Sequence, residues 1–350
     1  MAGQKVRRLV LIGEEASKGT AYFKKAAQES DYPLEFVPMP YGGAVDCFDV
    51  RPLQGSIVKL DPPRFQTADI REAGRLIGSY GRLLDKLERA EGIELLNSPQ
   101  AIKDTLDKQK CKELLSGTGV AATPVLAADI DDMEALKQLM RNCRKDRVFI
   151  KPRYGSGASG VLAYRINPRT GNEVLYTSVY ADGDTLTNTK KLRRFDDSGI
   201  ISRIGNGILG AGAVVEEWIP KARHGTKSYD LRVVYQFGRI EYMVARQSAG
   251  PITNLHLNND ALAVADLGLG RETIAAIEQL CCRAVSYFEG LRVAGIDILL
   301  TRGTLVPYII EINAQGDLIY QDIGHGNRIY RGQIRYIQDH MQSEYDWRQE

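Results

Sequence analysis

Two acidic residues lie inside strongly apolar stretches in the C-terminal part of the chain. Asp297 lies within VAGIDILLT and Glu311 within LVPYIIEIN, and the turn Arg302-Gly303-Thr304 separates the two stretches. This pattern predicts a β-hairpin. The hairpin would set the two carboxylates roughly opposite each other, with Cβ atoms about 5 Å apart. Burying unpaired charges is costly, and these two charges also repel each other, so the pattern favours a bound cation.

Asn313 adds an amide oxygen to this pair of carboxylates. It lies two residues beyond Glu311, so both side chains project from the same face of the strand. Oxygen ligands suit Mg²⁺, which keeps its other coordination positions for water and phosphate. We therefore predict a magnesium site formed by Asp297, Glu311 and Asn313. The alternative is that one carboxylate only pairs with an arginine.

A glycine cluster has the spacing of a phosphate-binding loop, and it comprises Gly155, Ser156, Gly157 and Gly160. In a dinucleotide-binding fold the motif G-x-G-x-x-G opens a helix. Here the strand-like VLAYRI follows it, so we place the glycines at the tip of a hairpin. Lys151 precedes the loop on VFIKP, where its ammonium group would neutralise a phosphate that the loop N–H groups cover. A flexible turn is the alternative interpretation.

Two arginines on neighbouring predicted strands supply further positive charge. Arg232 lies in DLRVVYQF and Arg246 in IEYMVARQ, and the turn Gly238-Arg239 joins the two strands. Guanidinium groups bind phosphate through paired donors, so both arginines would converge on one anion if they faced the same cleft. A surface ion pair is the alternative for either arginine alone.

The composition limits the classes of protein to which this chain can belong. With 350 residues, 43% of them hydrophobic, the chain is expected to form a soluble protein of two or three domains. A formal net charge of +2 argues against nucleic acid as the main partner. No apolar run is long enough for a membrane span or a signal peptide. Five scattered cysteines without a C-x-x-C motif favour reduced thiols and a cytoplasmic location.

Hydrophobic periodicity predicts the elements that must position these residues. Residues 6–12 begin an α/β unit, and residues 67–90 form a helix. A single further helix begins at the capping sequence Asn97-Ser98-Pro99 and runs to about residue 116. Strands then predominate between residues 148 and 247. A helix over residues 271–289 precedes the acidic hairpin, and a last helix follows Asn327.

Residues 181–212 are predicted to form a long loop, because they are rich in Gly, Asp, Thr and Lys and have weak periodicity. The segment contains a basic patch, Lys190-Lys191-Leu192-Arg193-Arg194. A solvated charge run is the simplest interpretation. The sharper hypothesis is that the patch attracts an acidic substrate such as a peptide tail or a polycarboxylate.

Taken together, six separated elements resemble the ATP-grasp superfamily over roughly residues 95–325. They are Lys108 in LDKQK, Lys151 with the glycine loop, Glu216-Glu217-Trp218-Ile219, Asp230-Leu231-Arg232, Arg246, and Asp297 with Glu311-Ile312-Asn313. The chain looks most like the branch that holds the ribosomal-protein glutamate ligase and glutathione synthetase. The resemblance implies an α/β fold with a Rossmann-like pre-domain at residues 1–97. Two α+β subdomains, at residues 98–215 and 216–350, would hold ATP between them.

The resemblance also implies a role for each matching residue. Lys108 and Lys151 would hold the nucleotide phosphates under the glycine loop, and Asp230 or a nearby acid would lie near the ribose. Arg246 would stabilise the transferring phosphoryl group, with Arg232 beside it. The metal ligands would bind two Mg²⁺ ions. The adenine would contact the backbone of Glu216, Glu217, Trp218 and Ile219.

The reaction implied by the resemblance is ATP-dependent ligation of a carboxylate to an amine. The carboxylate attacks the γ-phosphate to form an acylphosphate, and the amine then displaces phosphate, leaving an amide and ADP. An ATP-grasp kinase acting on a small molecule and a non-catalytic nucleotide-binding protein are the alternatives. Residues 251–260 and 314–317 depart from the family pattern, so the substrates, an amino acid or a peptide among them, stay open. A homo-oligomer also stays open.

Overall fold

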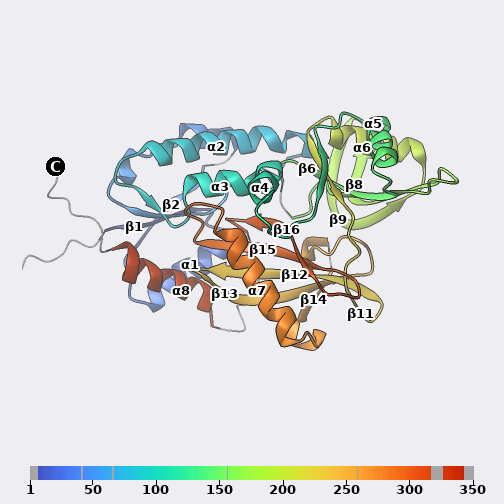
Figure 1. Cartoon of the computed structure of the whole chain (residues 1–350). Helices are drawn as coiled ribbons and strands as arrows, with labels where there is room; N and C mark the ends of the chain where they lie inside the picture. The colour runs from blue at the N-terminus through green and yellow to red at the C-terminus, as the bar shows by residue number, and fades with distance from the viewer. Residues whose placement is uncertain are drawn as a thin grey trace, which may run out of the picture.

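The computed structural model describes residues 7–40, 42–64, 67–155, 157–257, 259–316 and 326–342. These residues form three β-sheets flanked by helices, an α/β architecture that confirms the predicted fold class. Figure 1 shows the first and second sheets along the top of the molecule and the third sheet, with helix α7, below them. No helix in the described ranges is long and apolar enough to cross a membrane.

The first sheet is parallel, with strand order β2-β1-β3-β4. Parallel neighbours need crossover connections, and helices α1 and α2 provide two of them. Short 3₁₀ turns lie at Gly42–Cys47, Arg51–Leu53 and Ile70–Glu72. The main elements are β1 (Leu9–Gly13), α1 (Lys18–Glu29), β2 (Leu34–Pro38), β3 (Ile57–Leu60), α2 (Ala73–Arg89) and β4 (Glu94–Leu95).

The predicted single helix over residues 97–116 is wrong, because the chain forms two helices there. These are α3 (Pro99–Leu106) and α4 (Lys108–Leu115), and Asp107 between them has extended backbone angles. The Asp107 side chain accepts a hydrogen bond from the Lys110 N–H and also pairs with Arg153. A capping aspartate thus stops one helix and starts the next, which places Lys108 at the first position of α4.

The second sheet is antiparallel, with strand order β5-β10-β6-β7-β8-β9. Helices α5 and α6 cover one of its faces and share with it an apolar core that contains Met133, Leu136 and Ile204. Strand β10 continues to Glu217, past the predicted domain boundary at residue 215. The elements are β5 (Val125–Ala128), α5 (Met133–Asn142), β6 (Arg147–Pro152), β7 (Leu162–Ile166), β8 (Glu173–Asp182), β9 (Thr185–Phe195), α6 (Ser198–Leu209) and β10 (Ala213–Glu217).

The prediction of a loop over residues 181–212 is also wrong, since the segment forms the β8–β9 turn, edge strand β9 and helix α6. Glycines in α6 lower its helix propensity, but two of them leave room for neighbouring side chains. A Cβ atom on Gly205 would lie 2.3 Å from the Met133 sulfur, and one on Gly207 would lie 2.5 Å from a Leu186 methyl carbon. These glycines therefore let α6 pack closely against α5 and β9.

The third sheet has strand order β14-β13-β12-β15-β16, with β11 paired to β12. The last helix, α8, packs against α1 of the first domain, and the rings of Phe23 and Tyr330 lie 5.9 Å apart. Figure 1 shows α1 and α8 side by side. The elements are β11 (Arg223–His224), β12 (Lys227–Gln236), β13 (Arg239–Ser248), β14 (Asp260–Ala263), α7 (Arg271–Val285), β15 (Val293–Leu300), β16 (Pro307–Asn313) and α8 (Arg328–Tyr336) followed by a π turn (Ile337–Met341); 3₁₀ turns lie at Leu255–Leu257 and Val264–Leu267.

Candidate active site

The two predicted carboxylates face each other across the pair β15–β16. Asp297 and Glu311 are direct cross-strand partners, and Gly295 is the partner of Asn313. Asp297 is buried, whereas the Glu311 side chain is 21% exposed. Next to the turn Leu300 pairs with Pro307, and a register shift between Asp297 and Ile298 then brings Asp297 opposite Glu311, as predicted. Within the described ranges no group of three or more His, Cys, Asp or Glu side chains is arranged to hold a metal ion.

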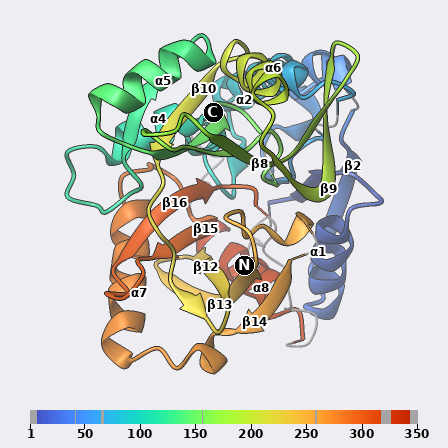
Figure 2. The same cartoon turned by 90° about the vertical axis from the view of Figure 1, so that its right-hand side faces the viewer.

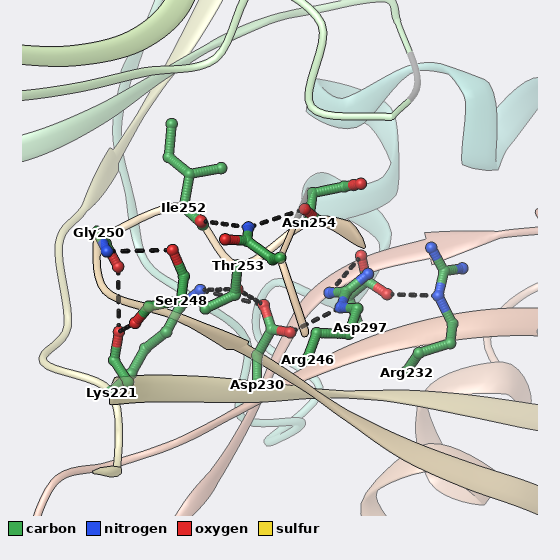
Figure 3. Close-up of polar contacts among 12 residues, drawn as sticks. Lys221, Asp230, Arg232, Arg246, Ser248, Gly250, Ile252, Thr253, Asn254 and Asp297 are labelled. Atoms are coloured by element: carbon green, nitrogen blue, oxygen red, sulfur yellow. Dashed lines mark hydrogen bonds and ion pairs between the residues drawn. The ribbon is translucent and has the colours of Figure 1, made fainter. Parts of the chain in front are cut away.

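Both predicted arginines converge on the carboxylate of Asp297 (Figure 3). Arg232 Nε lies 2.9 Å from Oδ1, and Arg246 Nη2 lies 3.1 Å from Oδ2. Arg232 passes close to two backbone positions that must lack a side chain, because a Cβ atom on Gly295 or Gly316 would lie 2.5 or 3.0 Å from its Nη1. Asp297 is therefore paired with arginines, as the alternative to a metal site predicted for one of the two carboxylates.

Asp230 fixes the direction in which Arg246 points. Its Oδ1 accepts a hydrogen bond from Arg246 Nε at 2.7 Å, and its Oδ2 lies 3.0 Å from Lys221 Nζ and accepts a hydrogen bond from the Thr253 hydroxyl. Burial acts to raise the pKa of Asp230, but Arg246, Lys221 and Thr253 outweigh it and hold that pKa well below its ordinary value. The contact of Asp230 with a ribose stays a prediction.

Lys108 lies between the glycine loop and the acidic hairpin. Its Nζ donates a hydrogen bond to the Gly155 carbonyl at 2.6 Å and lies 3.5 Å from Glu311 Oε1. The position of Lys108 at the start of α4, created by the break at Asp107, brings it to this point. A buried lysine with one carbonyl and one carboxylate neighbour retains donor capacity for a ligand.

Lys151 pairs with Glu216, a buried residue on the neighbouring strand β10. Lys151 Nζ lies 2.7 Å from Glu216 Oε2, and Lys112 Nζ lies 3.7 Å from the same atom. Lys112 also donates to Thr123 Oγ1 at 2.6 Å. Burial acts to raise the pKa of Glu216, but the two lysines and the Thr123 hydroxyl lower it overall. The carboxylate is therefore charged at neutral pH.

Most of the residues described above line a cavity of about 750 Å³, including its open mouth, between the second and third sheets. A larger cavity of about 2760 Å³ opens beside it toward the first domain, and both are lined by Gly155, Ser159 and Glu311. The predicted residues that line the first cavity are Lys108, Lys151, Gly155, Glu216, Glu217, Ile219, Asp230, Arg246, Asp297 and Glu311.

Five predicted residues lie elsewhere. Gly157 and Asn313 line the second cavity, whereas Arg232, Trp218 and Gly160 line neither. The Trp218 ring packs on Phe149 with ring centroids 5.0 Å apart. Ser156 is outside the described residues.

Three residues of the site were missed by sequence reasoning: Lys112, Lys221 and Thr253. Lys112 follows Lys108 by four residues on one helix, a spacing that puts both on the same face. Lys221 closely follows the Glu216–Ile219 segment that the resemblance marked. For Thr253 the sequence carries no comparable signal.

Gly160 ends the glycine loop in a conformation that a side chain would disturb. Its φ is +73°, and an added Cβ atom would lie 2.4 Å from Pro152 Cγ. Because the resemblance implies a nucleotide under this loop, Gly160→Ala is expected to displace the loop and weaken nucleotide affinity about tenfold, as measured by calorimetry. Gly171→Ala is the matched control, because Gly171 has φ +71° in another hairpin turn and no atom within 4 Å of the added Cβ. Equal affinities in the two variants would contradict a role for the loop.

The buried ion pairs of Glu216 and Asp230 are expected to make the fold less stable at acidic pH. The folded-state pKa values of Glu216 and Asp230 lie below their ordinary values of 4.5 and 3.8, so their stabilisation is complete above those ordinary values and is lost as the pH falls through the folded-state values. The free energy of unfolding, measured with urea from about pH 7 to about pH 3, should fall mainly below about pH 4. Asp230→Asn should reduce the steepness of that fall, and an unchanged slope would contradict the assignment.

Comparisons with known proteins address the fold. No model of a protein family matches the sequence, and no curated protein matches it. Solved structures do match it. One is the ATP-grasp ligase PsnB in complex with the precursor peptide PsnA2 and AMPPNP, with a TM-score of 0.52, 14% identity, and coverage of 93% of this chain and 96% of that one. This chain has an ATP-grasp fold.

Two further structures support the same conclusion. The D-alanine–D-alanine ligase from Bacillus anthracis has a TM-score of 0.58 at 12% identity, with 95% of this chain and 96% of that one covered. The macrocyclase MdnC, bound to the precursor peptide MdnA from Microcystis aeruginosa MRC, has a TM-score of 0.56 at 14% identity, with 93% and 99% covered. The predicted fold is confirmed, while the predicted branch stays a prediction.

Proposed function

We propose that the first cavity binds ATP with Mg²⁺ and that the protein is an ATP-dependent carboxylate–amine ligase. The observation that carries the proposal is the convergence of Lys108, Lys151, Arg246 and the pair Asp297–Glu311 on one cavity beside the glycine loop. Cations for phosphate and oxygen ligands for a divalent metal then lie side by side. The solved structures with the same fold, which are ATP-grasp ligases in complexes with AMPPNP, or with ADP and Mg, lend support.

Glu311 is the donor best placed for magnesium, because Arg232 and Arg246 hold both carboxylate oxygens of Asp297. Glu311 is partly exposed in the cavity, where Lys108 is its ion-pair partner, so its carboxylate can accept a metal. Asp297 lies opposite it, and Asn313 follows on the same strand. Mg²⁺ is commonly held by one or two carboxylates plus substrate phosphates, so a nucleotide would complete the site. When bound, the metal would neutralise charge on the phosphates.

Glu216 suggests why the nucleotide would be ATP. It lines the cavity, and its Oε1 atom is buried without a hydrogen-bond partner among the described residues. An orphaned acceptor is costly, and the amino group of adenine would satisfy it, whereas the carbonyl oxygen of guanine would repel it. ATP should therefore bind more tightly than GTP. Glu216→Gln adds a hydrogen-bond donor, so it should reduce the difference in affinity between ATP and GTP.

Different residues of the chain would bind the phosphates and stabilise charge during phosphoryl transfer. Lys108 and Lys151 would hold the phosphates, and Arg246, oriented by Asp230, would stabilise charge on the transferring phosphoryl group. The substrate carboxylate would approach from the second cavity near Gly155, Ser159 and Glu311, which line both cavities. Its oxygen attacks the γ-phosphorus and releases ADP, and the amine then attacks the acyl carbon and releases phosphate.

The test is a screen for phosphate release. ATP and Mg²⁺ are supplied with pools of amino acids and short peptides, and products are identified by mass spectrometry. The proposal expects free phosphate, ADP and a product joined with loss of water. A phosphorylated product without free phosphate would indicate a kinase instead. Nucleotide binding without turnover in any pool would favour a non-catalytic protein.

A further inference from the structure

We propose that the second cavity selects an acidic peptide, and that Lys18 and Lys190 bind carboxylates of this peptide other than the one that reacts. The inference rests on the proposed function, because the second cavity is where a substrate would meet the nucleotide. It adds the substrate class, which the fold leaves open.

The inference rests on the charged residues that line the second cavity and on their ion-pair partners. Three carboxylates line the second cavity, and each already has a cation within 4 Å. Two lining lysines, Lys18 and Lys190, have neither an ion-pair nor a hydrogen-bond partner for their ammonium groups among the described residues. Two of the three cations that pair with the carboxylates, Lys59 and Lys108, lie outside the wall, so the charges of Lys18 and Lys190 stay uncompensated. The carboxylate pairs are Glu14 with Arg64, Asp61 with Lys59, and Glu311 with Lys108.

Lys190 is placed at the cavity by a bulge in β9. Thr177 pairs with Arg193 and Val179 with Asn188, so residues 189–192 of β9 loop out of the ladder. Leu192 at the end of the bulge packs in an apolar cluster with residues of the third domain, including Ile252 and Leu257. The bulge is thereby anchored on one side, and the exposed Lys190 lines the cavity on the other.

Lys18 reaches the same cavity from the first domain. It is the first residue of α1, and Ser17 and Gly19 beside it also line the cavity. The positive end of the helix dipole adds to the charge of its ammonium group. Two uncompensated cations on different domains therefore face one space, and a ligand with well-separated carboxylates is complementary to them.

The spread of the cavity wall over distant parts of the chain favours a peptide over a single dicarboxylic acid. The space that a water-sized sphere can occupy in it is about 980 Å³, at the upper end of the range of roughly 300–1,000 Å³ that is usual for small-molecule sites. Its wall contains residues from widely separated parts of the chain, such as Lys18, Thr187 and Gln315. An extended segment of several residues would contact these distant groups at once.

The test measures binding, separately from turnover. Fluorescein-labelled hexaglutamate and hexaglutamine peptides are titrated with the full-length protein, and anisotropy is recorded at low and physiological salt. We expect the glutamate peptide to bind about tenfold more tightly or better, with a dependence on salt. The double variant Lys18→Gln, Lys190→Gln should weaken its binding about five- to tenfold and flatten the salt dependence.

A matched control removes the same charge elsewhere. Lys25 and Lys110 are exposed and line neither cavity, so Lys25→Gln, Lys110→Gln should leave binding of hexaglutamate unchanged. Equal affinities for the two peptides in the native protein, or equal losses in the two double variants, would overturn the inference. Binding of AMPPNP with Mg²⁺ is measured in parallel, and its absence would overturn the proposed function instead. Unfolding midpoints show whether each variant folds.

Discussion

Replacement of Glu311 by glutamine is expected to lower ATP-dependent phosphate release by about a hundredfold or more. The variant keeps the size of the side chain but removes the charge that would bind a divalent cation between Glu311 and Asp297. It also removes the carboxylate next to Lys108, at 3.5 Å, so this lysine would hold the phosphates with altered geometry. Phosphate release and the affinity for AMPPNP, with and without Mg²⁺, are the measurements.

The control for this variant is Glu113→Gln, which makes the same chemical change at an exposed position of α4. It should retain full activity. Binding of AMPPNP to Glu311→Gln should lose its dependence on Mg²⁺, a result that a merely unfolded variant would not give. Undiminished phosphate release by Glu311→Gln would show that the acidic hairpin is not the metal site.

Replacement of Arg246 by alanine is expected to destabilise the fold by about 3–5 kcal/mol. Arg246 is buried and contacts the carboxylates of Asp230 and Asp297 at 2.7 and 3.1 Å. Without it both carboxylates lose a partner inside the third domain. The free energy of unfolding in urea, measured at neutral pH, gives the magnitude. Arg239→Ala, at the exposed start of the same strand, should cost less than about 1 kcal/mol.

Arg246→Lys separates stability from activity. Lysine keeps a positive charge near Asp230 and Asp297, but it cannot donate to both through a planar fork. We expect a folded protein whose turnover is on the order of a hundredfold lower, while the affinity for AMPPNP changes little. Native turnover by Arg246→Lys would contradict a role for the guanidinium group in phosphoryl transfer.

The sequence predicted the parts of the site that local pattern controls. Asp297 and Glu311 belong to two apolar strands that flank a short turn, so the sequence predicts the hairpin, although a register shift beside the pair also contributes to their alignment. The glycine loop lies between β6 and β7 because Lys151 ends one apolar strand and VLAYRI starts the next. These relations depend on neighbours in the chain, so the sequence alone contains them.

The sequence missed features that depend on distant contacts. Arg153 pairs with Asp107 and supports the break that positions Lys108, but the two residues are far apart in the chain. The partners of Asp230, which are Lys221 and Thr253 as well as Arg246, come from separate loops and strands (Figure 3). Figure 2 shows β9 above α1 on the same side of the molecule, and residues of both elements line the larger cavity.

Transfer of oxygen-18 from a substrate carboxylate to phosphate tests the acylphosphate route most directly. Acidic peptides whose carboxylates carry the label are incubated with ATP, Mg²⁺ and amines, and the released phosphate is analysed by mass spectrometry. Attack of the carboxylate on the γ-phosphorus predicts one labelled oxygen in each phosphate released with amide formation. Unlabelled phosphate accompanying an amide product would contradict that route.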